Sequence, residues 1–201
     1  MDLGLKGRSA AILGGTRGIG RAIADTLAAE GANVAICARN ADQVRDAVAS
    51  LRDRGIRASG SSVDITDGAA LKKGAEKNGD AAFIVISSVS AAQADIASSY
   101  GPVKAALVHM AKGLARQYAP KKIRVNVVSP GTVYFKGGVW NMAEQHAPER
   151  FKQALARNPT GRMATPQDIA SAAVFLASPA SSFTTGSNLI VDGAISNRVN
   201  F

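Results

Sequence analysis

The sequence predicts one α/β domain built on a doubly wound parallel sheet. Short apolar, strand-forming runs alternate along the chain with helical patterns, as expected of βαβ units. The first apolar run leads directly into a glycine-rich turn and a helix, which is where such sheets bind nucleotides. The 201 residues, of which 46% are hydrophobic, are enough for one domain with a sizeable core.

The first half of the chain is predicted to alternate strand and helix over residues 9–13, 18–30, 33–37, 41–54 and 57–63. In the first helix Ile19, Ile23 and Leu27 recur at near four-residue spacing, which is typical of one buried helix face. Gly31 follows this helix and is placed to end it.

The second half is predicted to hold strands at residues 83–86, 123–128 and 189–191 and a long helix at 99–118. Between the two halves the alternation is interrupted. Residues 64–82 contain one helix-like stretch near 68–77 and no strand. A single crossover could fit there, so the length of this segment alone excludes nothing.

The composition of the chain limits the binding partners and the cellular location that we expect. Lys and Arg number 24 against 15 Asp and Glu, a net charge of +9, but the basic residues are scattered and only 5% of residues are aromatic. A base-stacking surface is therefore poorly supported, and we expect no nucleic-acid partner. No apolar run approaches a membrane span and no signal pattern opens the chain, so we expect no membrane and a cytoplasmic location. The single cysteine, Cys37, excludes an internal disulfide.

The glycine-rich turn predicts a dinucleotide site. Gly14 permits the tight turn, Gly18 lets the backbone approach a diphosphate, and Gly20 allows close packing of helix and strand. The free N–H groups at the start of the following helix then face the anion. The candidate cofactor-binding residues of this turn are Gly14, Thr16, Arg17, Gly18, Ile19 and Gly20.

The end of the second strand favours NADP(H) over NAD(H). NAD-preferring folds place Asp or Glu there to accept a hydrogen bond from the ribose, whereas this chain has Ala38 followed by Arg39. A carboxylate would repel a 2′-phosphate, and a guanidinium can bind it through two hydrogen bonds. Arg17 is a second candidate for the same phosphate. The alternative for each arginine is an ordinary exposed charge.

Tyr100 and Lys104 stand four residues apart near the start of the long helix, a spacing that places both on one face. A phenol is a weak acid at neutral pH, and a neighbouring ammonium favours its ionised form. Pro102 lies between them and is tolerated only in the first turn of a helix. The pair alone is common by chance, so its meaning depends on its surroundings.

Those surroundings resemble the short-chain dehydrogenase/reductase family. The matching motifs occur in family order as GGTRGIG (14–20), VDITD (63–67), ISSVS (86–90), YGPVK (100–104), VNVVSPG (125–131) and VDGA (191–194). The tail is most similar to the 3-oxoacyl-carrier-protein reductases and related ketone reductases. The resemblance implies a Rossmann-like domain that transfers hydride between NADP(H) and a ketone or secondary alcohol. It also implies a homo-oligomer, a tetramer or a dimer, and allows a 3-oxoacyl thioester on an acyl carrier as substrate.

The resemblance also implies roles for individual residues. Tyr100 would protonate the carbonyl oxygen, Lys104 would support Tyr100 and bind the nicotinamide ribose, and Ser88 would donate to the carbonyl oxygen. Ser87 is the alternative serine, since it stands at the usual family spacing from Tyr100, while strand register favours Ser88. The remaining cofactor contacts would be Asp64 and Ile65 at the adenine and Pro130, Gly131 and Val133 at the nicotinamide. No metal is expected.

The chain departs from the family pattern in three places. Leu13 replaces a threonine before the first glycine, and Phe135 stands where a threonine often binds the nicotinamide amide. The third departure is an absent central strand with its flanking helices, about 50 residues. We expect residues 1–201 to form a single domain from which this segment is missing, at a point between 74 and 78. A non-catalytic nucleotide-binding protein of the same fold is the alternative.

Overall fold

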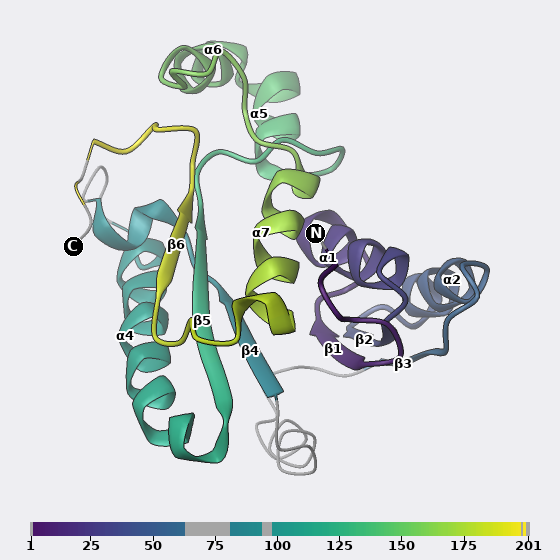
Figure 1. Ribbon diagram of the computed structural model, residues 1–201. Helices are drawn as coiled ribbons and strands as arrows, with labels where there is room; N and C mark the ends of the chain where they lie inside the picture. Colours follow the sequence, from purple (N-terminus) through teal and green to yellow (C-terminus); the bar gives the residue numbers. More distant parts are fainter. Residues whose placement is uncertain (1, 63–80, 94–97, 198, 200–201) are drawn as a thin grey trace.

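The computed structural model describes residues 2–62, 81–93, 98–197 and 199, and Figure 1 shows their arrangement. The first part of the chain forms β1 (Ser9–Leu13), α1 (Gly18–Ala29), β2 (Asn33–Ala38), α2 (Ala41–Arg52) and β3 (Ala58–Ser62). The second part forms β4 (Ala81–Ile86), η1 (Val89–Ala92), α4 (Tyr100–Tyr118), η2 (Ala119–Lys121), β5 (Ile123–Pro130), α5 (Val139–His146), α6 (Pro148–Ala156), α7 (Pro166–Ala177), η3 (Pro179–Ser181) and β6 (Asn188–Val191).

The strands form two parallel sheets of three, in the orders β1-β2-β3 and β4-β5-β6. Within the described residues no ladder joins β1 to β4, so each of these strands is the edge of its sheet. All the pairings are parallel, and helices connect the strands, which confirms the predicted α/β class.

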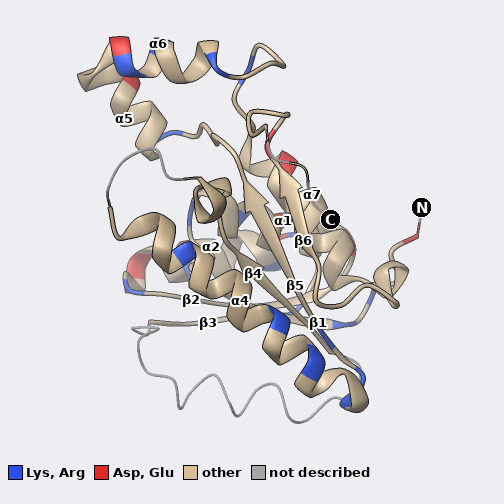
Figure 2. Cartoon of the chain, turned by 90° about the vertical axis from the view of Figure 1, so that its left-hand side faces the viewer, with Lys and Arg blue, Asp and Glu red and all other residues tan. Residues whose placement is uncertain are grey.

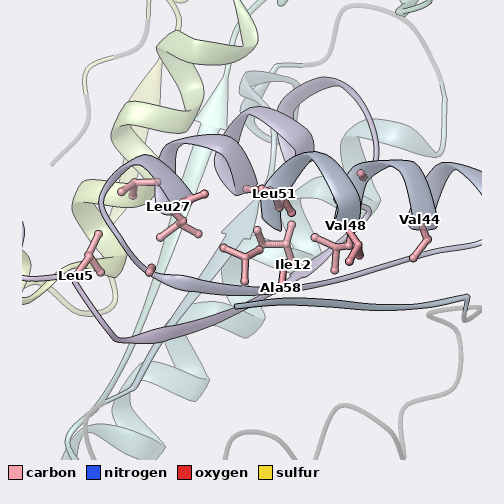
Figure 3. Close-up of a cluster of buried hydrophobic side chains, with 14 residues drawn as sticks. Leu5, Ile12, Leu27, Val44, Val48, Leu51 and Ala58 are labelled. Atoms are coloured by element: carbon pink, nitrogen blue, oxygen red, sulfur yellow. The ribbon is translucent and has the colours of Figure 1, made fainter. Parts of the chain in front are cut away.

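Apolar side chains of α1 and α2 cover one face of the first sheet, where Leu27, Val44 and Leu51 pack with Ile12 of β1 (Figure 3). This explains the spacing seen in the sequence, because α1 and α2 each present residues three or four apart to the strands below. The opposite face is less covered. Leu13, at the end of β1, is 43% exposed. Parallel sheets are normally covered on both faces, so this sheet lacks cover among the described residues.

The second sheet lies between two helices. Val85 of β4 and Val125 and Val127 of β5 face α4, where Ala111 and Ala115 pack against them. The alternate residues Ile84, Ile86 and Val128 face α7. This alternation is what a strand buried on both faces requires, because successive side chains point to opposite faces.

Helix α7 connects the two sheets. Its Val174 belongs to the core of the first sheet, while Ile169 and Ala173 belong to the core of the second. The helix begins in a capping box, in which the Thr165 side chain accepts from the backbone of Asp168 and the Asp168 carboxylate accepts from the backbone of Thr165. A well-capped helix thus holds the halves together where no strand ladder does.

The predicted elements that fall within the described residues lie where expected, with small differences at their ends, and the helix-like stretch near 68–77 lies outside those residues. Strand β4 begins at Ala81 rather than residue 83, because Ala81 already pairs with Ile123. Strand β5 continues to Pro130, because Ser129 and Pro130 pair with β6. The expected break between residues 74 and 78 lies outside the described residues. Among those described, no helix is long and apolar enough to cross a membrane.

Candidate active site

The glycine turn after β1 has the geometry that its sequence predicts. Gly14 adopts φ +80° and Gly18 φ +56°, both in the left-handed region that favours glycine. A Cβ on Gly20 would lie 2.2 Å from the carbonyl oxygen of Gly14, so α1 can begin this close to the turn only without a side chain there. The turn therefore brings backbone rather than side chains to the carboxyl end of β1.

The start of α1 has the chemistry of an anion site. Arg17 is its N-cap residue, has extended backbone geometry, and makes no side-chain capping hydrogen bond. The first turn contains no acidic residue. The first N–H groups of a helix have no partners within it, and the helix dipole favours negative charge at this end. These groups fit the diphosphate of a dinucleotide.

Arg17 and Arg39 extend this site to one side. They follow β1 and β2, which are neighbours in the sheet, and both are exposed. Among the described residues no carboxylate forms an ion pair with either one, so both guanidinium groups can bind a phosphate. Asp64 and Ile65, the expected adenine contacts, lie outside the described residues.

Tyr100 and Lys104 come together at the start of α4. The Lys104 Nζ lies 5.6 Å from the centroid of the Tyr100 ring. It also donates a 3.0 Å hydrogen bond to the carbonyl oxygen of Ile86, at the end of β4. Partial burial lowers the pKa of Lys104 from its ordinary value. Tyr100 itself is 54% exposed, so its hydroxyl can reach a substrate.

The two candidate serines have different surroundings. Both are buried, and the Ser87 hydroxyl donates to the carbonyl oxygen of Lys104 at 2.9 Å. The Ser88 hydroxyl accepts from the backbone N–H of Ser90 at 3.2 Å. No acceptor among the described residues receives the Ser88 O–H, so that hydroxyl keeps a proton to donate.

A close backbone contact, which the sequence reasoning missed, brings the start of α4 against η1. A Cβ on Gly101 would lie 2.8 Å from the carbonyl oxygen of Ser90, so only glycine lets the start of α4 approach η1 this closely. Gly101 directly follows Tyr100, and η1 directly follows Ser88. The glycine next to the tyrosine was the available signal, but a single glycine does not say what it approaches.

The expected nicotinamide contacts follow β5. Gly131 donates its backbone N–H to the carbonyl oxygen of Val191, and a Cβ on Gly131 would lie 2.9 Å from the Cα of Asp192. Val133 is buried in the apolar cluster around α7. Pro130 ends β5 and pairs with Val191. The structure thus places these residues at the carboxyl end of the second sheet, and their contact with a cofactor stays a prediction.

Helices α5 and α6 stand above this end of the sheet in Figure 1. Their base is held by Tyr134, whose hydroxyl bonds to Glu144 and accepts a 3.0 Å hydrogen bond from Asn141. The Tyr134 ring packs edge-to-face on Phe151 of α6. The hydrogen bond to Glu144 raises the pKa of Tyr134, which therefore stays protonated.

Within the described residues no group of acidic, His and Cys side chains could hold a metal ion.

Comparison with known families identifies the chain. Residues 69–196 match the family model described as enoyl-(acyl carrier protein) reductase, and residues 8–81 match the one described as short chain dehydrogenase. The chain belongs to the short-chain dehydrogenase/reductase family. This confirms the expectation drawn from the sequence motifs, and places the chain among oxidoreductases.

Individual members of the family are similar over their whole length. An isoepoxydon dehydrogenase from Penicillium expansum is 31% identical, over 97% of each chain. A 7α-hydroxysteroid dehydrogenase solved with NADH and 7-oxo glycochenodeoxycholic acid superimposes with a TM-score of 0.88 at 28% identity, over 99% of this chain and 98% of that one. A short-chain oxidoreductase from Pseudomonas aeruginosa PAO1, solved with NADPH, gives 0.80 at 25%, over 96% and 98%.

The alignment with the Penicillium expansum protein runs over 251 residues, whereas this chain has 201. At least 50 positions of that alignment are therefore without a residue of this chain. Where along the chain these positions fall is not fixed by that length, so the absent strand and its helices stay a prediction.

Proposed function

We propose that this family member is an NADPH-dependent reductase of ketones, which it converts to secondary alcohols with Tyr100 as the proton donor. The observation that carries the proposal is the close approach of the start of α4, which carries Tyr100 and Lys104, to η1, which follows Ser88. The Lys104 ammonium lies beside the Tyr100 ring, and Ser88 reaches the same end of the sheet through η1, which packs on the start of α4.

The preference for NADPH rests on this chain's own residues. The similar structures were solved with NADPH in one case and NADH in another. Arg17 and Arg39 supply two positive charges after β1 and β2 that pair with no carboxylate of the described residues, and Arg39 stands where an NAD-binding fold would carry a carboxylate. A 2′-phosphate would find charge-assisted hydrogen bonds there, and a bare ribose hydroxyl would not.

Each of the three side chains has a distinct task. Ser88 donates its free O–H to the carbonyl oxygen of the substrate and so holds it near Tyr100. Tyr100 gives its phenolic proton to that oxygen, and the Lys104 ammonium stabilises the phenolate that remains. Bound NADPH would supply the hydride to the carbonyl carbon. Lys104 is held for this task by its hydrogen bond to Ile86.

The substrate is proposed to be apolar or extended. The segment 132–160, which includes α5 and α6, carries Tyr134, Phe135, Val139, Trp140 and Met142. Val139 and Met142 of α5 are 63% and 55% exposed and stand three residues apart, on one side of the helix. Apolar groups left exposed near a site favour an apolar ligand. A 3-oxoacyl thioester on an acyl carrier remains one member of this class.

We also infer that the domain assembles as a homo-oligomer. Val103 and Met110 of α4 are large, apolar and about half exposed, and they stand seven residues apart on one side of the helix. The helix and the following η2 carry Lys112, Arg116 and Lys121 and no acidic residue, as Figure 2 shows along α4. A second copy would bury the apolar side and leave the basic side in solvent.

The rival is a non-catalytic nucleotide-binding protein, and it is favoured by the lack of a ladder between the two sheets among the described residues. The experiment that separates the two functions uses the purified chain, NADPH or NADH, and a panel of apolar ketones. We expect NADPH to be oxidised with at least one ketone, and NADH far more slowly. NADPH binding without turnover on any ketone would favour the rival. Equal use of both cofactors would show that Arg17 and Arg39 do not select NADPH.

A further inference from the structure

Phe135 lies on the glycine turn. It belongs to the loop between β5 and α5, yet a Cβ on Gly18 would lie 2.8 Å from its Cζ and 2.9 Å from its Cε2. The same end of the ring also lies against Gly138, where a Cβ would lie 2.9 Å from both Cε1 and Cζ. The ring therefore occupies a slot between two glycines from different halves of the chain, and neither position could carry a side chain with the ring in place.

This position conflicts with cofactor binding. Gly18 is the glycine whose missing side chain allows a diphosphate to approach the backbone. The ring of Phe135 now lies in the space beside it, and an aromatic ring offers no hydrogen bond to a phosphate. The ring and the diphosphate compete for the same space beside Gly18.

The loop around Phe135 can accommodate a movement of the ring. Its carbonyl oxygen accepts the backbone N–H of Gly138, which makes a tight turn, and Gly137 adopts φ +75°. Two glycines thus stand two and three residues after Phe135, and Gly138 is the N-cap residue of α5. The loop is anchored on its other side by the backbone hydrogen bond from Tyr134 to Ala164. A rotation at Phe135 can therefore occur in the turn without breaking that anchor.

We propose that Phe135 gates the diphosphate part of the cofactor site and sets the affinity for NADPH. This inference rests on the proposed function. With the ring on Gly18 the site is closed, and the cofactor binds only the fraction of molecules in which the ring has turned away. The observed affinity is lowered by that fraction. Since minor states in such equilibria are commonly populated at 10% or less, removing the ring is expected to tighten NADPH binding by about tenfold or more.

The test compares two ligands and three variants by calorimetric titration. NADPH spans the whole site, whereas adenosine 2′,5′-bisphosphate carries the adenosine and the 2′-phosphate but no complete diphosphate bridge or nicotinamide. Phe135→Ala removes the ring, and Phe135→Leu keeps apolar bulk should the alanine variant fail to fold. The matched control is Phe151→Ala, which removes a ring that packs on Tyr134 in the same region.

We expect Phe135→Ala to bind NADPH about tenfold more tightly or better, Phe135→Leu to change in the same direction, and the bisphosphate, which carries only the adenosine-side phosphate of the bridge, to change much less. Phe151→Ala should leave both affinities unchanged. Unchanged or weaker NADPH binding in both Phe135 variants would overturn the gate, and weaker binding would show that the ring supports the cofactor instead. Failure of the bisphosphate to bind even the wild-type chain would overturn the proposed cofactor site, and the gate with it.

Discussion

Ser87 donates its hydroxyl hydrogen to the carbonyl oxygen of Lys104 across 2.9 Å, and so ties the end of β4 to the first turns of α4. The Lys104 side chain returns a bond to the carbonyl oxygen of Ile86, the residue before Ser87. Two hydrogen bonds in opposite directions thus fix α4 against β4. They hold Lys104 while the neighbouring hydroxyl of Ser88 stays available.

The different hydrogen bonds of the two serines predict different effects: a loss of kcat for the Ser88 variant and a loss of stability for the Ser87 variant. Ser88→Ala should lower kcat by about 10²- to 10³-fold, the usual loss of one donor to a developing oxyanion. Ser87→Ala should lower the free energy of unfolding by about 1 kcal/mol, the net value of a hydrogen bond, with a smaller loss of kcat. Turnover assays and urea denaturation of both variants check this. The reverse pattern would make Ser87 the serine that contacts substrate.

Tyr100→Phe should retain NADPH binding and lose turnover by about 10⁴-fold, the upper end of general acid catalysis, because no second acid is placed beside Tyr100 among the residues that the structure describes. The matched control is Tyr118→Phe, the same chemical change about 27 Å away along α4 at 1.5 Å per residue. Steady-state rates and a cofactor titration measure the two effects. A Tyr100→Phe enzyme with near wild-type rates would refute the proton-donor role.

Arg39→Asp should reverse the cofactor preference. Loss of a charge-assisted contact to the 2′-phosphate costs about 1.5–3 kcal/mol, or roughly 10- to 150-fold in NADPH affinity. NADH should gain, because the new carboxylate can accept from the ribose. Arg116→Asp, an equal charge change on α4, controls for the general field of the protein. If both variants lose NADPH affinity equally, Arg39 makes no specific contact.

The sequence predicted most of the elements because their signals are local. The spacing of Ile19, Ile23 and Leu27 marked α1, and the four-residue interval from Tyr100 to Lys104 fixed their common face. The roles of Gly101 and Phe135 could not be predicted, since both depend on contacts with residues distant in the sequence. The choice between Ser87 and Ser88 also needed coordinates, because it depends on where one hydroxyl finds its acceptor.

The Asp168 carboxylate predicts a pH-dependent stability. Hydrogen bonds from Arg162, and then from Thr165, hold its pKa well below the usual range. Stability from a carboxyl with a depressed folded pKa is present above the unfolded pKa of about 4 and is lost as pH falls below it. Asp168→Ala should therefore unfold more easily near neutral pH, by about 1 kcal/mol for a lost cap.

Denaturation of this variant across the pH range should show the difference from wild type shrinking below about pH 4. Asp42→Ala is the matched control, because Asp42 also lies in a first helical turn but forms only an exposed pair with Arg45. It should change stability by less than about 1 kcal/mol. A constant difference for Asp168→Ala at all pH values would show that its charge does not contribute.

The edges of β1 and β4 predict that the working domain contains a further strand. Each edge carries N–H and C=O groups without ladder partners in the described structure, and each such group costs about 1–3 kcal/mol when buried unpaired. A domain is stable by only about 5–15 kcal/mol, so two such edges could not be buried empty. The exposed Leu13 and Phe83, at 43% and 42%, lie on these same two strands.

We therefore expect the intact mass of the protein from its natural source to exceed 20.6 kDa by the mass of at least 50 residues. We also expect the 201-residue chain by itself to unfold at a lower denaturant concentration, and to reduce ketones more slowly, than a chain that contains the further strand. Insertion of the corresponding segment of the Penicillium expansum relative should raise both stability and turnover. A natural mass of 20.6 kDa, with a cooperative and stable fold, would show that the two sheets suffice. The non-catalytic nucleotide-binding function would then explain the protein better than the reductase function, because the natural protein would lack the strand that normally joins the two halves of the site.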